Sequence, residues 1–478
     1  MGQAFTRRRF LQSSTAGVAS GALLAGTAGA ADAPASVAPG DDAPQPKQDP
    51  LRFGYIGTGI RYHGLVHEGC QFGPCLAVCD VDAVQRGRAL ESANRNNGRH
   101  GRVIVDHYED YRDLLKRDDV DVVVIATPDH WHTKIAIDAM LAGKDVYCEK
   151  PLTLTIREGQ HLLKVAEETG KLLFVGTQQR TECDRLFPRA AAIVRDGRIG
   201  EVRRVTCAIG GSPGAVPVPV AAPPKPFNWD MWLGQAPLTP YRVMDKPAAE
   251  GGYGSEFPYG RGHAHFRWWY EYSGGKLTDW GAHHVDIALW ALGKNSGPYG
   301  VVDVDPLRVE HPVKLDECGM PTQDDRFNTA TSFHVRCTLA DGVVLEVRDE
   351  AYDMGFDNGI MFEGDKGRIF VNRGKLTGAA VDELATNPLP VDALRKLMGK
   401  EPPASHMADF VQCVRTRETP VSDAASHHRT ISLCHAVNVA LRLGRKVQFD
   451  TAAETFGSDA VANAFVDRLQ RAAYAIQS

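Results

Sequence analysis

The fold is decided by one short segment, Leu51-Arg52-Phe53-Gly54-Tyr55-Ile56-Gly57-Thr58-Gly59. Its apolar beginning predicts a short buried strand, and a helical pattern starts near Tyr62. A second apolar strand, Leu76-Ala77-Val78-Cys79, ends at Asp80, which lies 21 residues after Gly59. A strand, a glycine turn, a helix and an acid about 20 residues further on form the βαβ unit that binds a dinucleotide.

Each residue of this unit has a physical role. Gly57 permits a tight turn and Gly59 lets a pyrophosphate approach the backbone, where the helix N-terminus favours negative charge. A carboxylate at Asp80 accepts hydrogen bonds from ribose hydroxyls and repels a 2′-phosphate, which favours NAD over NADP. Tyr62 replaces the third glycine of the G-x-G-x-x-G pattern, so we expect looser packing of helix on strand there. A strand–turn–helix without a nucleotide is the alternative interpretation.

The alternation of strands and helices continues. Residues 108–116 are predicted to be helical, and residues 120–126 form the strongly apolar strand that a parallel sheet buried on both faces requires. Thr127-Pro128-Asp129-His130-Trp131-His132 ends this strand and begins a helix that runs to about Gly143. Residues 145–148 form another short strand, followed by Glu149-Lys150-Pro151. Side chains at the carboxyl ends of such strands face the ligand crevice.

A further apolar strand at residues 172–175 is followed by Gln178, Gln179 and Arg180. One interpretation is that these polar side chains contact a cofactor or substrate, since they also follow the carboxyl end of a strand. The other is that they belong to a surface loop.

The composition is that of an ordinary globular protein. Of the 478 residues, 43% are hydrophobic and 24% are charged, and the net charge is -5. The length favours two or three domains, and the mild acidity argues against nucleic acid or an anionic membrane as a partner. The ten cysteines include no CxxC pair, and no Cys/His set has zinc-finger spacing. We therefore interpret the cysteines as buried small side chains, and we expect no metal site.

The first 30 residues have the pattern of an export signal. Thr6-Arg7-Arg8-Arg9-Phe10-Leu11 precedes a small, apolar stretch that ends in Ala28-Gly29-Ala30. A charged start, an apolar middle and an A-x-A end indicate a signal peptide, and Arg-Arg before Phe-Leu resembles the twin-arginine signal. That pathway exports folded proteins, so we expect a periplasmic protein that takes up any cofactor before export. A Sec signal or a disordered tail is the alternative.

The Pro/Ala-rich residues 31–50 are expected to be a linker. No later stretch reaches 18 consecutive apolar residues, so no membrane span is expected after signal removal. The folded part of the protein is therefore expected to begin near residue 51.

Taken together, four motifs resemble the Gfo/Idh/MocA family, which is named after glucose–fructose oxidoreductase, inositol dehydrogenase and a rhizopine-catabolism protein: Gly57-x-Gly59, Asp80, Thr127-Pro128 with His132, and Glu149-Lys150-Pro151. The resemblance covers roughly residues 51–450. It implies an α/β protein with a Rossmann dinucleotide-binding domain at 51–176, a substrate and oligomerisation domain at 177–450, and a tail at 451–478. It also implies a homo-oligomer and a cofactor site at Gly57, Gly59, Asp80, Thr127, Pro128, His132, Glu149 and Lys150.

The second part of the chain fits the α+β domain of this family, which is built on a large, mostly antiparallel open sheet. Residues 202–206 are predicted to be a strand, residues 331–347 a hairpin turning at Asp341-Gly342, and residues 359–372 another strand pair. Alternation of apolar and polar residues in 332–336 indicates a sheet with one exposed face. Residues 407–443 have helical periodicity and are expected to pack near the domain junction.

The strongest signal in the second domain is the segment Gly274-Gly275-Lys276-Leu277-Thr278-Asp279-Trp280-Gly281-Ala282-His283-His284-Val285-Asp286. On a helix, Asp279 and His283 are separated by four residues and share a face, and Asp286 is the neighbour of His283 three residues on. The segment looks like the family's D-x-x-x-H-x-x-D motif, which implies that Asp279 and His283 line the substrate site opposite Lys150. A helix face without catalytic function is the alternative.

These residues predict a mechanism of hydride transfer. His283 is the expected general base or acid, because imidazole titrates near neutrality. Lys150 would hydrogen-bond the reacting oxygen, and Asp279 would bind a neighbouring hydroxyl or hold His283. Lys150 as the base and His284 as the imidazole are the alternatives. Glu149 is expected to contact the cofactor or a structural partner.

The expected substrate is a small carbohydrate: a sugar, inositol or a sugar derivative. Aromatic side chains are dense in residues 227–232 and 266–270, where they form either a stacking platform for sugar or part of the core. We predict Asp279, Arg180 and Trp268 as substrate contacts. His130 and His132 suggest a metal, but no carboxylate or cysteine at ligand spacing completes a site.

Four functions are compatible with this sequence. The motifs favour an NAD-dependent sugar or polyol dehydrogenase over an NAD-dependent glycosidase, which oxidises a sugar transiently and eliminates its substituent, and over a non-catalytic nucleotide sensor. Free NAD is scarce outside the cytoplasm, which raises the weight of the glycosidase and of a sugar–sugar oxidoreductase that keeps its cofactor bound.

Overall fold

The computed structural model describes residues 49–245, 254 and 256–477. The expected signal peptide and nearly all of the expected linker therefore lie outside the described residues. Within the described ranges, no helix is both long and apolar enough to cross a membrane. The expected homo-oligomer stays a prediction.

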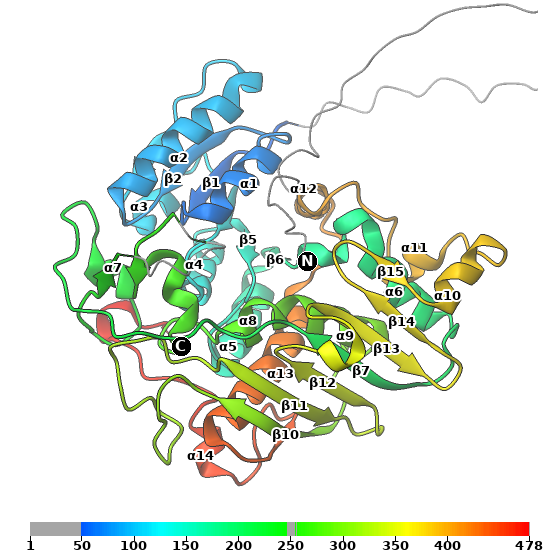
Figure 1. Cartoon of the computed structure of the whole chain (residues 1–478). Helices are drawn as coiled ribbons and strands as arrows, with labels where there is room; N and C mark the ends of the chain where they lie inside the picture. Colours follow the sequence, from blue (N-terminus) through cyan, green and yellow to red (C-terminus); the bar gives the residue numbers. More distant parts are fainter. Residues whose placement is uncertain (1–48, 246–253, 255, 478) are drawn as a thin grey trace, which may run out of the picture. The chain divides into compact units, whose positions relative to one another are not determined.

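The first sheet is built from short apolar runs that are buried along their length. Its strands are β1 (Phe53–Ile56), β2 (Cys75–Cys79), β3 (Asp106–Tyr108), β4 (Val122–Ile125), β5 (Asp145–Glu149) and β6 (Leu173–Gly176). All neighbours pair in parallel, in the order β3-β2-β1-β4-β5-β6 (Figure 1). The strand order reverses between β1 and β4, and this reversal opens a crevice at the carboxyl ends of the strands.

Five helices connect these strands: α1 (Ile60–Gly69), α2 (Ala83–Asn96), α3 (Tyr111–Leu115), α4 (Asp129–Leu141) and α5 (Ile156–Thr169). Side chains cap three of their N-termini, since Asp82 accepts from Val84 N, Asp110 from Arg112 N, and Thr155 from Glu158 N. Helix α1 has no such cap at Gly59, so its first N–H groups are left for another partner.

Tyr62, which replaces the third glycine of the G-x-G-x-x-G pattern, is fully buried and does not disturb the packing of α1. Its ring meets the ring of Tyr55 edge-on at 5.4 Å, and its hydroxyl donates to the carbonyl oxygen of Ala89 at 3.0 Å. The aromatic side chain thus fills the space between α1, β1 and α2 that closer packing would otherwise remove. Helix α1 also begins at Ile60, two residues earlier than expected.

The second sheet has eight strands: β7 (Val202–Ala208), β10 (Val301–Glu310), β11 (Ser332–Thr338), β12 (Val344–Arg348), β13 (Gly359–Gly364), β14 (Arg368–Val371), β15 (Leu376–Thr377) and β16 (Val447–Asp450). Their order is β15-β14-β13-β7-β12-β11-β10-β16, and all neighbours are antiparallel except β7 and β12. The expected fold class is confirmed: a parallel nucleotide-type sheet followed by a mixed, mostly antiparallel one.

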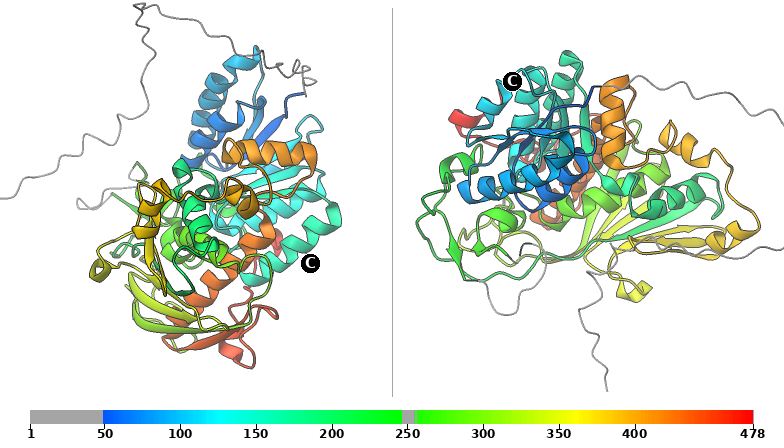
Figure 2. Two further views of the ribbon diagram at one scale, coloured as in Figure 1. Left: turned by 90° about the vertical axis from the view of Figure 1, so that its right-hand side faces the viewer. Right: turned by 90° about the horizontal axis from the view of Figure 1, so that it is seen from above.

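Helices α6 (Leu186–Arg195), α9 (Gly281–Leu292) and α13 (Ala424–Leu443) cover one face of this second sheet (Figures 1 and 2). In β11, Phe333, Val335 and Cys337 point into the core that they share with these helices, whereas the residues between them are partly or fully exposed. This alternation is the one the sequence predicts for a half-exposed sheet.

The expected helical stretch at 407–443 forms two helices, not one. Helix α12 (His406–Thr416) ends at Arg417, which adopts a left-handed conformation with φ of 62°, and Pro420 lies in the connection to α13. Because of this break, α12 packs on the first sheet, where Phe410 contacts the rings of Tyr147 and Phe174. Helix α13 instead packs on the second sheet.

The remaining short elements are α7 (Trp229–Leu233), β8 (Val243–Met244), β9 (Tyr259–Gly260), α8 (Lys276–Asp279), α10 (Ala379–Asp382), α11 (Ala393–Met398) and α14 (Ala460–Asn463). We call the described residues of 215–245 and 256–273 the aromatic lobe. Its core consists mainly of ring side chains, among them Phe227, Trp229, Trp232, Tyr241, Tyr259, Phe266, Trp269 and Tyr272. Most of the two aromatic runs therefore belong to a core.

Arg180 is part of a buried ion pair and does not face the crevice. Its Nε and Nη2 each donate to a carboxylate oxygen of Asp286 at 2.7 Å, and both side chains are 1% exposed. Burial alone would raise the pKa of Asp286, but the Arg180 charge outweighs it and holds the pKa at about 2. Its placement does not support the expectation that Arg180 binds substrate, because its guanidinium is already occupied by Asp286, Ser426 and the Val421 carbonyl.

Replacing Arg180 with methionine should leave the Asp286 carboxylate buried without its counterion. We expect the variant to lose about 3–5 kcal/mol of unfolding free energy, measured by chemical denaturation. The double variant Arg180→Met/Asp286→Leu should recover much of this loss, because it removes both charges. Arg203→Met is the matched control, since the Arg203–Glu201 pair is 64% and 69% exposed and should contribute little. Unchanged stability with lost ligand binding would instead identify Arg180 as a ligand contact.

Candidate active site

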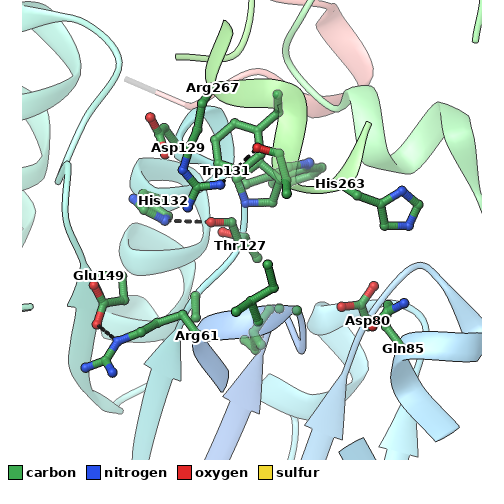
Figure 3. Close-up of a pocket in the computed structure, with 18 of the residues that line it drawn as sticks. Arg61, Asp80, Gln85, Thr127, Asp129, Trp131, His132, Glu149, His263 and Arg267 are labelled. Carbon is green, nitrogen blue, oxygen red and sulfur yellow. Dashed lines mark hydrogen bonds and ion pairs between the residues drawn. The ribbon is translucent and has the colours of Figure 1, made fainter. Parts of the chain in front are cut away.

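A cavity of about 460 Å³ lies at the carboxyl ends of the first sheet. The strand ends of β1, β2, β4 and β5 form one wall, and the aromatic lobe with α8 and α9 forms the other. Figure 3 shows Asp80 and Gln85 on one side of this cavity and Glu149 and Arg61 on the opposite side, with Thr127 between them. The cavity therefore spans the crevice at the reversal of strand order, where open α/β sheets bind ligands.

The glycine turn fits a dinucleotide. Gly57 has φ of 83°, and a Cβ there would lie 2.5 Å from the backbone nitrogen of Thr127, so only glycine allows β1 to turn so close to β4. A Cβ at Gly59 would meet nothing within 4 Å, because this residue borders the cavity. The uncapped N-terminus of α1 begins there, which suits a pyrophosphate in the cavity.

Asp80 follows β2 and is held in a fixed orientation. Thr58 donates from its backbone nitrogen and its hydroxyl to Oδ2 at 2.7 and 3.0 Å, and the backbone nitrogen of Asp82 donates to Oδ1 at 2.9 Å. Burial raises the pKa of Asp80, while these donors act in the opposite direction. The carboxylate lines the cavity and presents its remaining acceptor capacity to a ligand.

Glu149 has structural partners. Arg61 Nε and Gln178 Nε2 donate to its Oε1 at 2.8 and 2.7 Å. This arrangement fits the structural role that we considered for Glu149, although the residue also borders the cavity, as Gln178 does. Gln179, in contrast, does not line the cavity.

His132 ties the ends of two strands together. Its ring nitrogens lie 2.6 Å from the carbonyl oxygen of Pro151 and 2.9 Å from that of Thr127. Because Thr127 follows β4 and Pro151 follows Lys150, this ring fixes Lys150 relative to the centre of the sheet. Thr127, Pro128 and His132 all line the cavity.

An ion pair between Lys150 and Asp279 connects the domain of the first sheet with the domain of the second sheet. Lys150 Nζ donates to Asp279 Oδ1 at 2.7 Å and to the Asp279 carbonyl oxygen at 3.0 Å. The two side chains are 13% and 16% exposed. Burial alone would raise the pKa of Asp279, but the charges of Lys150 and Arg267 outweigh it and hold the pKa well below its usual range.

His283 lines the same cavity, one turn after Asp279. The predicted helix is divided here, since α8 ends at Asp279 and α9 begins at Gly281. Burial, followed by the charges of Lys150 and Arg373, lowers the pKa of His283 well below its ordinary value. The imidazole is therefore neutral at neutral pH and able to accept a proton. His284 points away from the cavity, toward Asn358 and Phe187.

Several charged residues of the cavity were missed by sequence reasoning, and Arg267 and Asp129 are two of them. Arg267 Nε lies 3.7 Å from Asp279 Oδ1, and Asp129 accepts a hydrogen bond from Ser273 Oγ. Burial raises the pKa of Asp129. Both face the cavity in Figure 3. Asp129 could have been predicted, because it lies inside the Thr127–His132 motif at the end of a strand. Arg267 gave no such signal, because it lies within an aromatic run.

The aromatic lobe covers the Asp80 end of the cavity. Its backbone pairs with the loop after β2, where Ala83 N donates to Pro226 O at 2.8 Å and Asn228 N donates to Val81 O at 3.0 Å. The ring of His263 lies 2.9 Å from Asp82 Oδ2. Trp268, a predicted substrate contact, lines the cavity, whereas the neighbouring Trp269 is fully buried.

Within the described ranges, no group of three or more His, Cys, Asp or Glu side chains is arranged to hold a metal ion. His130 is fully buried, and its Nε2 lies 2.9 Å from the carbonyl oxygen of Trp232. Burial lowers its pKa to about 3, so the ring stays neutral and serves packing between α4 and the aromatic lobe.

The strand order, the glycine turn and the carboxylate after β2 define a dinucleotide-binding protein. Two family models match the chain. The model described as "Oxidoreductase family, NAD-binding Rossmann fold" matches residues 51–177, and "Oxidoreductase family, C-terminal alpha/beta domain" matches residues 213–476. The chain belongs to the Gfo/Idh/MocA oxidoreductase family, and its first domain is of the NAD-binding type.

Among curated proteins, the chain is similar to a glycosyl hydrolase family 109 protein of Shewanella baltica, with 34% identity over 205 residues. The match covers 41% of this chain and 44% of that protein. A family 109 protein of Shewanella sp. strain ANA-3 is 37% identical over 159 residues, 33% of this chain and 34% of the relative. The matched region thus spans less than half the length of these relatives.

Among solved structures, the WlbA dehydrogenase of Bordetella pertussis, in complex with NADH and UDP-GlcNAcA, has a TM-score of 0.55 at 18% identity. The match covers 83% of this chain and 98% of that one. A levoglucosan dehydrogenase in complex with NADH and L-sorbose also has a TM-score of 0.55 at 18% identity, covering 84% and 99% of the two chains. Because the sequence identity is only 18%, these two structural similarities establish the fold of the chain and nothing more.

Replacing Asp80 with asparagine should keep the shape of the cavity and remove the charge. We expect NAD binding to weaken about 10- to 100-fold, because hydrogen bonds to a charged acceptor are lost. NADP binding should weaken less or improve, since the repulsion of a 2′-phosphate is also lost. Cofactor titrations followed by tryptophan fluorescence measure both constants. Asp106→Asn on β3 is the control, because it removes the same charge from a side chain that is 52% exposed. An unchanged ratio of NAD to NADP affinity would contradict this role.

Proposed function

We propose that the protein is an NAD-dependent oxidoreductase that moves a hydride between nicotinamide and a hydroxyl-bearing carbon of a sugar, an inositol or a sugar derivative. NADP is the less favoured cofactor, because Asp80 presents a carboxylate at the ribose end. One observation carries the proposal: a continuous cavity is lined both by the glycine turn with Asp80 and by Lys150, Asp279 and His283.

NAD, when bound, supplies the hydride acceptor. In our proposal Gly57, Gly59 and Asp80 hold it, with Thr127, Pro128, His132 and Glu149 along the same wall. The conformation of Gly57 and the open space beside Gly59 support this assignment.

His283 is the proposed general base. Its Nδ1 is buried and has no hydrogen-bond partner among the described residues, and its pKa is lowered well below the ordinary value by burial and nearby cations. A neutral imidazole in this position can take the hydroxyl proton as the carbonyl forms. Its depressed pKa implies that the acid limb of the pH profile for oxidation lies well below about 6.5.

Lys150 is the proposed donor to the reacting oxygen, and Asp279 positions it. The ammonium of Lys150 stabilises negative charge on the oxygen as the proton leaves, which lowers the barrier to its removal. The 2.7 Å contact with Asp279 fixes the ammonium in place, and an Asp279 oxygen is close enough to this centre to accept from a neighbouring hydroxyl. Trp268 offers a ring face for the C–H groups of a sugar.

A second candidate is an NAD-dependent glycosidase, which oxidises a sugar transiently, eliminates its substituent and returns the hydride. The similarity to glycosyl hydrolase family 109 proteins favours it. The backbone contacts of the aromatic lobe over the Asp80 end also suit a cofactor that stays bound between turnovers. The same feature suits a sugar–sugar oxidoreductase.

We also propose export to the periplasm by the twin-arginine pathway. The support is the segment Thr6-Arg7-Arg8-Arg9-Phe10-Leu11 with its apolar continuation. A protein that takes up its cofactor in the cytoplasm has to fold before export, which a pathway for folded proteins permits.

Replacing Lys150 with methionine or His283 with glutamine should lower the rate of hydride transfer by about 10²- to 10⁴-fold. NAD affinity should change only a few-fold, because neither side chain belongs to the glycine turn. Stopped-flow absorbance of NADH with a panel of sugars and glycosides measures the rate, and fluorescence titration measures the affinity. Released aglycone is quantified in the same samples.

His284→Gln is the matched control, because His284 is the next residue of α9 and lies outside the cavity. It should keep the rate of hydride transfer once compared at equal folded fraction. Aglycone release without net NADH would favour the glycosidase. Full hydride transfer in both Lys150→Met and His283→Gln would refute the proposed site.

Replacing Arg7 and Arg8 together with lysine should retain the protein in the cytoplasm, since that pathway requires the arginine pair rather than its charge. Cell fractionation followed by immunoblotting measures the distribution. Arg9→Lys is the control, because it makes the same substitution next to the pair. Normal export of the double lysine variant would contradict the proposal.

A further inference from the structure

We propose that the substrate carries an oxyanion, and that Lys276 and Arg373 bind it. The proposal rests on the proposed function, because it places the anion beside the reacting end of the cavity. The substrate class is thereby narrowed from sugars in general to acidic sugars, such as those bearing a carboxylate, phosphate or sulfate.

Lys276 is a half-buried cation without a bound counterion. Its Nζ lies 5.7 and 5.8 Å from the ring centres of Trp268 and Trp280, and no carboxylate oxygen of the described residues lies within 4 Å of it. Burial lowers the pKa of Lys276, and Asp279, the carboxylate that opposes this shift, already contacts Lys150. An ammonium enclosed by two indole rings is stabilised by an incoming anion.

Lys276 also borders a second hollow, whose lining includes Asp349, Glu350 and Asp357 but not Lys150. These carboxylates do not neutralise it. Arg308 pairs with Asp349 at 2.5 Å and with Glu350 at 3.7 Å. None of the three is an ion-pair partner of Lys276, so the charge of Lys276 remains available to the cavity.

Arg373 supplies a second cation at the mouth of the same cavity. It follows β14, is exposed, and holds its guanidinium 4.5 Å above the ring of Trp280. Its Nε lies 3.1 Å from the amide oxygen of Gln179 when that amide is oriented to match its donors and acceptors. The stacked ring and the amide fix a planar donor group that suits a carboxylate or phosphate.

Among the described residues, the charges around the reacting end do not balance. The cations are Lys150, Arg267, Lys276 and Arg373, and the carboxylates are Asp129 and Asp279. Arg267 is left out of the balance because it has a further partner; the other three cations still exceed the two carboxylates by one positive charge, even with both carboxylates ionised. The remaining charges of the cavity either pair with each other, as Arg61 does with Glu149, or lie at the Asp80 end.

The phosphates of a dinucleotide do not explain this excess. The α1 N-terminus and the glycine turn serve them on the wall formed by the first sheet. Lys276 and Arg373 belong to the opposite wall, on α8 and after β14, and both contact Trp280 next to Asp279. An anion on the substrate is the partner that reaches them from the reacting carbon.

The test compares ligands that differ in one group. NAD-loaded protein is titrated with glucuronate and with glucose, and binding is followed by calorimetry and by tryptophan fluorescence. We expect glucuronate to bind at least 10-fold more tightly at low salt, with an advantage that shrinks as salt increases. Glucose 6-phosphate and glucose 6-sulfate identify which oxyanion the site prefers.

Lys276→Met and Arg373→Met should each reduce the preference for the acidic sugar about 10-fold, and Lys276→Arg should retain it. Lys375→Met is the matched control, because Lys375 is an exposed cation two residues from Arg373 that does not line the cavity. Thermal unfolding and NAD affinity are measured for every variant.

The inference would be overturned if glucose bound as tightly as glucuronate or more tightly. It would also be overturned if Lys276→Met and Arg373→Met lost NAD affinity by the same factor as they lost the preference for the acidic sugar. Oxidation of neutral sugars alone would overturn it while leaving the proposed function intact. Preferential binding of acidic sugars without hydride transfer or aglycone release would support the anion site and refute the proposed function.

Discussion

The rest of the site depends on the ion pair between Lys150 and Asp279. Each charge is poorly exposed, and either one alone would carry a large desolvation cost in this position. Lys150 follows the last residue of β5, and Asp279 ends α8, so their 2.7 Å contact joins the first sheet to the second domain where the cavity closes. Together with the Asp129–Ser273 hydrogen bond and the backbone contacts of the aromatic lobe, the pair holds the glycine turn of one domain in place relative to His283 of the other.

The imidazole of His283 stays neutral first because it is buried, and Lys150 adds to this effect. Lys150 is one of several cations near His283, and together with burial they disfavour a further positive charge on the ring. The residue thus stays a proton acceptor over the neutral range. Because Arg373 contributes to the same effect, a substrate anion that neutralised it would raise the pKa of His283. In our proposal, binding of an acidic substrate and the basicity of the His283 imidazole are consequently coupled through charge.

Much of this could be predicted from the sequence, because local signals sufficed. The β1 turn, Asp80 and Lys150 stand at the ends of short apolar strands, and parallel strands bring such ends together in space. Helical spacing predicted that Asp279 and His283 share a face, even though the helix is divided at Trp280, but their place in the site was implied by the resemblance to the family motif. Arg180 was not, because its role depends on Asp286, more than 100 residues away, and on burial between α9 and α13. Arg267 was hidden for a different reason: it lies within an aromatic run, and its contact with nearby Asp279 forms only in the folded chain.

The aromatic lobe shows a different limit of sequence reasoning. The lobe is attached to the loop after β2 by hydrogen bonds between backbone groups. Because these bonds, Ala83 N to Pro226 O and Asn228 N to Val81 O, involve no side chains, no pattern in the sequence reveals them. These contacts cover the Asp80 end of the cavity, whereas Trp268 and Arg267 of the same lobe lie near Lys276 and Asp279 at the other end. One segment thus contacts both halves of the site. Arg267, which lies 3.7 Å from Asp279, and the residues whose backbone pairs with the loop after β2 therefore belong to the same segment of chain, although they act at opposite ends of the cavity.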